Sequence, residues 1–149
     1  MQSLPNVDPA KIALWGGSYG GYLTAMGLAH NSDMFAAGVD MHGAHDWSID
    51  LERYSPKDAP DREAALKLAF QSSPNAAIAT WRSPVLLIHG DDDRNVDFSQ
   101  TTDLLQRLRV QKVHVEELIF PDEIHSFLMW KSWIRAYTAT EEFFGEELK

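Results

Sequence analysis

The motif Gly-x-Ser-x-Gly at residues 16–20 constrains the fold of this chain more than any other feature of its sequence. The apolar run Ile12–Trp15 comes directly before it, and the stretch Tyr19–His30, which reads as a helix, comes directly after. A serine between two glycines at a strand-to-helix junction predicts a sharp turn whose flanks leave no room for side chains. Such a turn exposes the serine oxygen at the end of a sheet, so we expect a strand here that feeds a helix.

The rest of the chain alternates short apolar runs with amphipathic stretches. Strands are predicted at Ile12–Trp15, Ala36–Met41, Pro84–His89 and Val113–Phe120. Helices are predicted at Tyr19–His30, Asp61–Phe70 with Asp61 as N-cap, Phe98–Arg109 and Phe127–Leu148, and residues 42–60 read as a long loop. This alternation predicts an α/β fold with about four parallel strands and helices on both faces of the sheet. The chemistry of such sheets lies at the carboxyl ends of the strands.

Length and composition exclude several classes of protein. The 149 residues, 44% of them apolar, suffice for one domain with its own core, and we expect a single domain over residues 1–149. The net charge of −9 argues against nucleic acid and anionic membrane as partners. No cysteine is present, which excludes disulfides, zinc–thiolate sites and a cysteine nucleophile. The sequence has no apolar run of membrane-spanning length and no signal-peptide pattern at residues 1–6.

A serine hydroxyl needs a base to take its proton, and the base needs a carboxylate to orient it. In a sheet of this kind the three groups follow the order serine, aspartate, histidine along the chain. Three aspartates, Asp91–Asp93, follow the third predicted strand, and His125 follows the fourth. His89 ends a strand and is expected to pack beneath the loop. These positions predict a serine hydrolase with Ser18 as nucleophile and His125 as base, and spacing alone leaves the choice among the three aspartates open.

Other interpretations of these residues are weaker. The aspartate cluster resembles a solvated turn or a calcium loop, but it lacks the alternating ligand spacing of an EF-hand. His42, His45 and Asp46 suggest a metal site, but no helical spacing or second cluster supports one. We therefore expect no metal and no cofactor. The aromatic residues of the last predicted helix are expected to form core and dimer surface: Trp130, Trp133, Tyr137, Phe143 and Phe144.

Three segments together resemble the catalytic domain of the prolyl oligopeptidase family of serine peptidases, with the dipeptidyl-peptidase and acylaminoacyl-peptidase branches most similar. They are residues 16–22, 86–96 and 121–125. The resemblance implies an α/β-hydrolase fold, a triad of Ser18, Asp93 and His125, and serine-peptidase activity on small peptides. It also implies that the Tyr19 backbone N–H binds the oxyanion, and that Trp47 and Asn95 bind the substrate.

The resemblance covers only the C-terminal half of such a catalytic domain. The family's second oxyanion donor, a tyrosine hydroxyl from an earlier loop, has no counterpart in this sequence, so we expect short or activated esters to be easier substrates than amides. A truncated sheet would expose the strand Ile12–Trp15 at its edge, so we expect a homo-oligomer that covers this edge. The alternatives are an inactive fragment that serves as an assembly or binding module, and an α/β protein that binds a small ligand at its strand ends.

Overall fold

The computed structural model describes residues 4–149 and contains one four-stranded parallel sheet. Its strands are β1 (Ala13–Gly17), β2 (Ala37–Met41), β3 (Val85–Gly90) and β4 (Val115–Phe120), and they lie side by side in chain order. β2 pairs with β1 and β3, and β3 pairs with β2 and β4, in each case in parallel. The predicted α/β architecture is confirmed, and β1 is an edge strand of this sheet.

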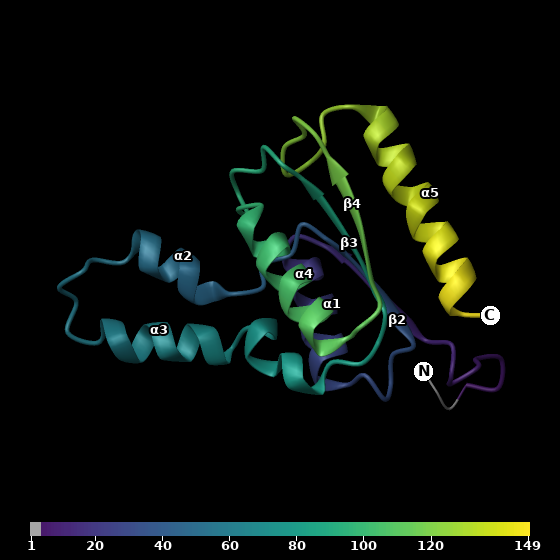
Figure 1. The fold of residues 1–149 in the computed structure, drawn as a ribbon, viewed down its shortest axis with the longest axis horizontal. Coiled ribbons are helices and arrows are strands. Elements are labelled where there is room, and N and C mark those ends of the chain that lie inside the picture. The colour runs from purple at the N-terminus through teal and green to yellow at the C-terminus, as the bar shows by residue number, and fades with distance from the viewer. Residues whose placement is uncertain (1–3) are drawn as a thin grey trace.

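Helices cover both faces of the sheet, as predicted, but they are divided unevenly (Figure 1). The helices α1 (Tyr19–His30) and α4 (Ser99–Gln111) connect neighbouring strands and lie on the same face. Because the strand order advances in one direction, right-handed crossovers return the chain on one side each time. Among the helices of residues 4–149, only the terminal helix α5 (Trp130–Glu147) covers the opposite face.

Each face of the sheet has its own apolar core. Leu28 of α1 and Leu104 of α4 pack with Trp81 on one side, and all three side chains are fully buried. On the other side Ile88 of β3 packs with Phe143 of α5. Both faces of β2 and β3 are therefore covered, which explains why every residue of these two strands is buried.

The long loop predicted over residues 42–60 is wrong, because it contains the helix α2 (Trp47–Tyr54). The side chain of Asp46 caps this helix by accepting a hydrogen bond from the Ser48 backbone N–H. The next helix, α3 (Arg62–Gln71), is close to the predicted one, but the Asp61 side chain makes no capping hydrogen bond. A 3₁₀ helix, η1 (Pro74–Thr80), follows it.

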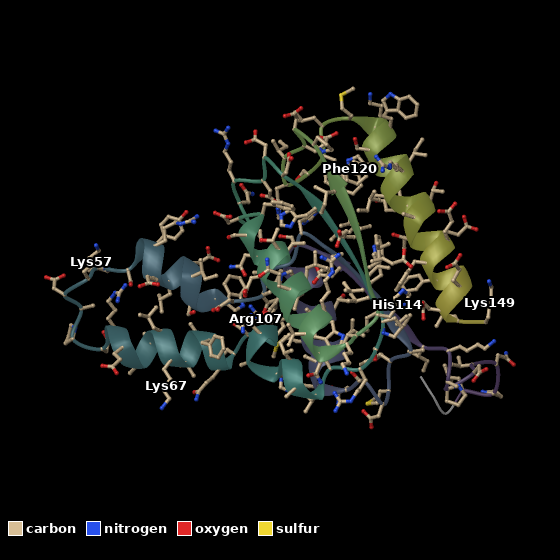
Figure 2. The ribbon with its side chains drawn as sticks, viewed as in Figure 1. Lys57, Lys67, Arg107, His114, Phe120 and Lys149 are labelled. Atoms are coloured by element: carbon tan, nitrogen blue, oxygen red, sulfur yellow. The ribbon has the colours of Figure 1, made fainter. Side chains whose placement is uncertain are left out.

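The helices α2 and α3 form an arm that projects away from the sheet (Figure 1). Lys57 and Lys67 lie on this arm in Figure 2, and neither of its helices has a buried residue. Within residues 4–149, no helix combines the length and apolarity needed to cross a membrane.

The carboxyl ends of the strands meet at one edge of the sheet, where Phe120 ends β4 (Figure 2). Ser18 follows β1 with φ 57°, His42 follows β2 with φ 43°, and Asp122 lies just beyond β4 with φ 60°. A positive φ angle is unfavourable for residues other than glycine and persists only where the surrounding structure enforces it. Three such residues at this edge of the sheet indicate where a functional site lies.

Candidate active site

The turn that carries Ser18 joins the end of β1 to the start of α1. Ser18 holds φ 57° and ψ −119°. A Cβ atom on Gly16 would lie 2.4 Å from the Gly20 carbonyl oxygen, so only glycine fits at position 16. A Cβ on Gly20 would meet open space. The expectation that both flanks exclude side chains is therefore wrong for Gly20. The backbone of Gly20 is what a side chain at position 16 would clash with.

Ser18, His125 and Asp93 form a continuous chain of hydrogen bonds. The Ser18 hydroxyl lies 2.8 Å from His125 Nε2, and His125 Nδ1 lies 2.6 Å from Asp93 Oδ2. A carboxylate can only accept, so Nδ1 carries the ring proton and Nε2 is free to accept from the hydroxyl. This arrangement can deprotonate the serine and hold the resulting imidazolium against a carboxylate.

Asp93 is the one buried aspartate of the three that follow β3. Its Oδ1 accepts from the backbone N–H groups of Asn95 and Val96, at 2.8 and 3.0 Å. Burial favours a raised pKa for the Asp93 carboxyl, but hydrogen bonds from His89, His125 and these two N–H groups outweigh it and hold the pKa well below its usual range. The group is therefore a permanent carboxylate at neutral pH.

His89 lies beneath the loop, as expected, but it also contacts Asp93. Its Nε2 lies 3.0 Å from Asp93 Oδ2 and 3.1 Å from the Val96 carbonyl oxygen, and its Nδ1 lies 2.7 Å from Thr101 Oγ1. Two acceptors at Nε2 place the proton there, so Nδ1 accepts from the threonine hydroxyl. His89 is fully buried and serves as a second donor to the carboxylate that orients His125.

Glu123 fixes the loop that carries His125, a role that the sequence did not indicate. Its buried carboxylate accepts from the Leu128 and Met129 backbone N–H groups and from the Ser132 hydroxyl at the start of α5. The Ser132 hydrogen bond, followed by the two N–H groups, lowers the pKa of Glu123 against the effect of burial. A negative charge at a helix N-terminus is favourable, so Glu123 anchors α5 and the loop together.

The Tyr19 N–H belongs to the first residue of α1 and has no acceptor within the helix. It adjoins Ser18, and a backbone N–H in such a position can bind a developing oxyanion. The Tyr19 ring lies 5.3 Å from that of Tyr22, which lies 5.5 Å from Trp47, so these aromatic rings connect the elbow to α2. Asn95 is exposed, and its backbone N–H is committed to Asp93.

A cavity of about 410 Å³ opens beside Ser18 between β1 and α5. Neither Trp47 nor Asn95 is among its lining residues, so the structure does not bring these two residues to the same cavity as Ser18. The lining is mainly aromatic and imidazole rings with small residues at the elbow: Trp15, Gly17, Ser18, Met41, His42, His125, Ser126, Trp133 and Tyr137.

Two of the three residues that suggest a metal site, His45 and Asp46, have other partners. His45 Nε2 lies 2.8 Å from Asp40 Oδ2 in the interior, and Asp46 caps α2. Across the part of the chain that the structure describes, no three histidine or carboxylate side chains are grouped so that they could hold a metal ion.

The sequence and the fold of this chain are similar to those of known proteins. The family model described as the prolyl oligopeptidase family matches residues 1–149. A probable dipeptidyl-aminopeptidase B from Arthroderma gypseum is 33% identical over 127 residues, which cover 81% of this chain. The dipeptidyl peptidase 4 of Porphyromonas gingivalis superposes on 99% of the chain with a TM-score of 0.84 at 26% identity. The acylaminoacyl peptidase of Pyrococcus horikoshii covers 97% with a TM-score of 0.83 at 24% identity, which supports the fold alone.

The chain spans only a small part of these proteins. It corresponds to 14% of the Arthroderma protein, 21% of the Porphyromonas structure and 25% of the Pyrococcus structure.

Proposed function

Since the chain belongs to the prolyl oligopeptidase family of peptidases, we propose that it is a serine hydrolase that cleaves small peptides or esters through Ser18, His125 and Asp93. The observation that carries the proposal is the chain of hydrogen bonds, 2.8 Å from Ser18 to His125 and 2.6 Å from His125 to Asp93. The low pKa of Asp93 adds support, because a carboxylate that stays ionised can stabilise the imidazolium that forms during the reaction.

In the proposed reaction, the Ser18 oxygen attacks the substrate carbonyl carbon while His125 Nε2 takes the hydroxyl proton. The tetrahedral intermediate collapses to an acyl-enzyme, and the imidazolium gives its proton to the leaving alcohol or amine. Water then attacks the acyl carbon, again losing a proton to His125, which returns that proton to Ser18 as the acid product leaves. Asp93 accepts the Nδ1 hydrogen bond throughout and does not itself take the proton.

The Tyr19 N–H is the proposed oxyanion donor, and its position at the start of α1 adds the favourable end of the helix dipole. One missing donor typically costs about 2.7–4 kcal/mol of transition-state stabilisation. An ester expels its alkoxide more readily than an amide expels its nitrogen, which must first be protonated, so a site with a single strong donor should favour short or activated esters over amides. Trp47, linked to Tyr19 through Tyr22, is the proposed wall for the residue before the scissile bond, and the exposed Asn95 side chain is a proposed ligand of the substrate backbone.

The relatives' names bear on the substrate class. The Arthroderma relative is named a dipeptidyl-aminopeptidase and the Porphyromonas structure a dipeptidyl peptidase, so short peptides are the proposed natural substrates. This chain corresponds to 14% and 21% of those proteins. We propose that it corresponds to the C-terminal half of a hydrolase catalytic domain, as the resemblance of its three motifs implies.

Hydrolysis of p-nitrophenyl acetate and of a dipeptide p-nitroanilide tests the proposal. The chain should release p-nitrophenol above the uncatalysed rate, should act more slowly on the anilide, and should lose both activities on Ser18→Ala. Circular dichroism of both proteins checks that the fold is kept. Ester hydrolysis that is the same with and without the Ser18 hydroxyl would refute the assignment. A folded chain with no turnover would favour the alternative, a module that binds or assembles without catalysis.

A further inference from the structure

A third histidine, His42, contacts the nucleophile and the base but takes no part in the proposed proton transfers. It follows β2 directly, with φ 43°, and is only 6% exposed. Its Nδ1 accepts a hydrogen bond of 3.1 Å from the Ser18 backbone N–H, and its ring centroid lies 4.2 Å from that of His125. The same ring lies 6.0 Å from Phe127, so it is held between the elbow and the loop of the base.

The hydrogen bond to Ser18 determines where His42 carries its proton. A backbone N–H only donates, so Nδ1 must present a lone pair and the neutral ring must be protonated at Nε2. A proton on Nδ1 would place two donors face to face and break the contact. Within residues 4–149, Nε2 is buried and has no hydrogen-bond partner, so no acceptor there stabilises a charged ring, and a second proton could go only to Nδ1, where it would face the Ser18 N–H.

The charges around His42 also disfavour a second proton. Burial, then the neighbouring rings of His125 and His89, lower the pKa of His42 to about 4, against the weaker opposing effects of Asp93 and Asp40. His42 is therefore neutral when His125 becomes an imidazolium, and it does not repel the charge that the reaction creates.

We propose that His42 is a positioning residue that holds the Ser18 backbone and the His125 ring in the geometry required for proton transfer. The inference rests on the proposed hydrolase function. Ser18 occupies a strained backbone conformation whose N–H is shared between the Met41 carbonyl oxygen at 2.9 Å and His42 Nδ1 at 3.1 Å. His125 comes from a loop 107 residues away in the chain. The His42 ring contacts both residues, because it accepts from the Ser18 N–H and packs against the His125 ring.

Two substitutions separate the acceptor from the ring. In His42→Asn the amide oxygen takes the place of Nδ1, the ring is lost, and asparagine tolerates the positive φ well. In His42→Phe the ring remains and the acceptor is lost. Misplacement of reacting groups by about 1 Å costs on the order of 100-fold in rate, so we expect kcat for the ester to fall about 10–100-fold in His42→Phe with little change in KM. In His42→Asn, which keeps an acceptor for the Ser18 N–H, kcat should fall less than in His42→Phe. His30→Asn, at the exposed end of α1, is the matched control and should leave kcat unchanged.

Proton and nitrogen NMR of the ¹⁵N-labelled wild type tests the same geometry without turnover. His42 should show a protonated Nε2 and a bare Nδ1 from pH 5 to 8, and the His125 Nδ1 proton, held at 2.6 Å from Asp93, should give a sharp low-field resonance. That resonance should broaden in His42→Phe, or in His42→Asn if the phenylalanine variant does not fold. A wild type that is inert toward esters would refute the proposed function, and the NMR result would still decide the role of His42. An Nδ1-protonated His42, or an unchanged His125 resonance and unchanged kcat in a folded variant, would overturn the inference.

Discussion

The backbone of Ser18 predicts an unusual order of stability among its variants. At φ 57° and ψ −119° the residue lies outside the regions that L-residues favour, and such a conformation costs about 1–3 kcal/mol. Glycine adopts it without this cost. Both Ser18→Ala and Ser18→Gly lose the hydroxyl and its hydrogen bond to His125, so the difference between the two variants depends on the backbone conformation alone, in the folded and the unfolded chain.

The free energy of unfolding of Ser18→Gly should exceed that of Ser18→Ala by about 1 kcal/mol. The strain of about 1–3 kcal/mol is offset by about 0.4–1 kcal/mol, because glycine gives the unfolded chain more conformational freedom. In a chain of about 150 residues, 1 kcal/mol shifts Tm by roughly 2–4 °C. Urea unfolding followed by circular dichroism measures the free energy of unfolding of each variant, and thermal unfolding measures Tm.

Gly145→Ala is the matched control, because at this position alanine rather than glycine should be the more stable residue. Gly145 lies in α5, where an added Cβ meets no atom within 4 Å and the backbone is helical. Gly145→Ala should therefore raise the free energy of unfolding by about 0.5–1 kcal/mol. If Ser18→Ala proves as stable as Ser18→Gly while the control behaves normally, the elbow is not strained and the reasoning fails.

Four further predictions follow from the same contacts. Asp93→Asn should lower kcat for ester hydrolysis by roughly 10⁴-fold, as the loss of the carboxylate does in other serine triads, and an unchanged rate would exclude the proposed role. The folded-state pKa of His42, about 4 against an ordinary value of 6.5, means that only the unfolded state takes up this proton between those two pH values. Stability should accordingly fall by up to about 3 kcal/mol as pH drops from 6.5 to 4, and urea titrations of His42→Asn should show a smaller fall. Gly16→Ala should cost about 1–3 kcal/mol of unfolding free energy through its clash with the Gly20 carbonyl, whereas Gly20→Ala should cost little. We also propose that the edge strand at residues 12–15, with Trp15 52% exposed, pairs or packs with a second copy, and a strictly monomeric species by light scattering at micromolar concentration would contradict this.

The sequence predicted the parts of the fold that depend on local pattern. The continuous apolar run Val85–Ile88 marked a doubly covered strand, and the glycines around Ser18 marked the elbow. Observed strand bounds differ from predicted ones by at most two residues. The helix α2 was missed because Pro56 and Pro60 beyond it suggested a loop, although Asp46 followed two residues later by Ser48 was a readable N-cap signal.

The supporting residues of the site could not be read from the sequence. Spacing did not distinguish Asp93 from its two neighbours, because the distinction lies in burial and in hydrogen bonds from His89 and His125 that form only in the folded chain. Similarly, the sequence indicates His42 only as a candidate metal ligand, because its contact with Ser18 depends on the pairing of β1 with β2. The hydrogen bonds of His89 and His42 form only in the folded chain, and neither residue belongs to a periodic pattern or motif that would indicate them.

The central claim is that His125 and Asp93 activate Ser18, and covalent labelling with a fluorophosphonate tests it most directly. The probe reacts with a serine whose proton has a base to accept it. Intact-mass and peptide mass spectrometry should show one adduct on the wild type, located at Ser18, much slower labelling of Asp93→Asn, and no adduct on Ser18→Ala. A folded wild-type chain that takes no label, or that is labelled at another residue, would contradict the account.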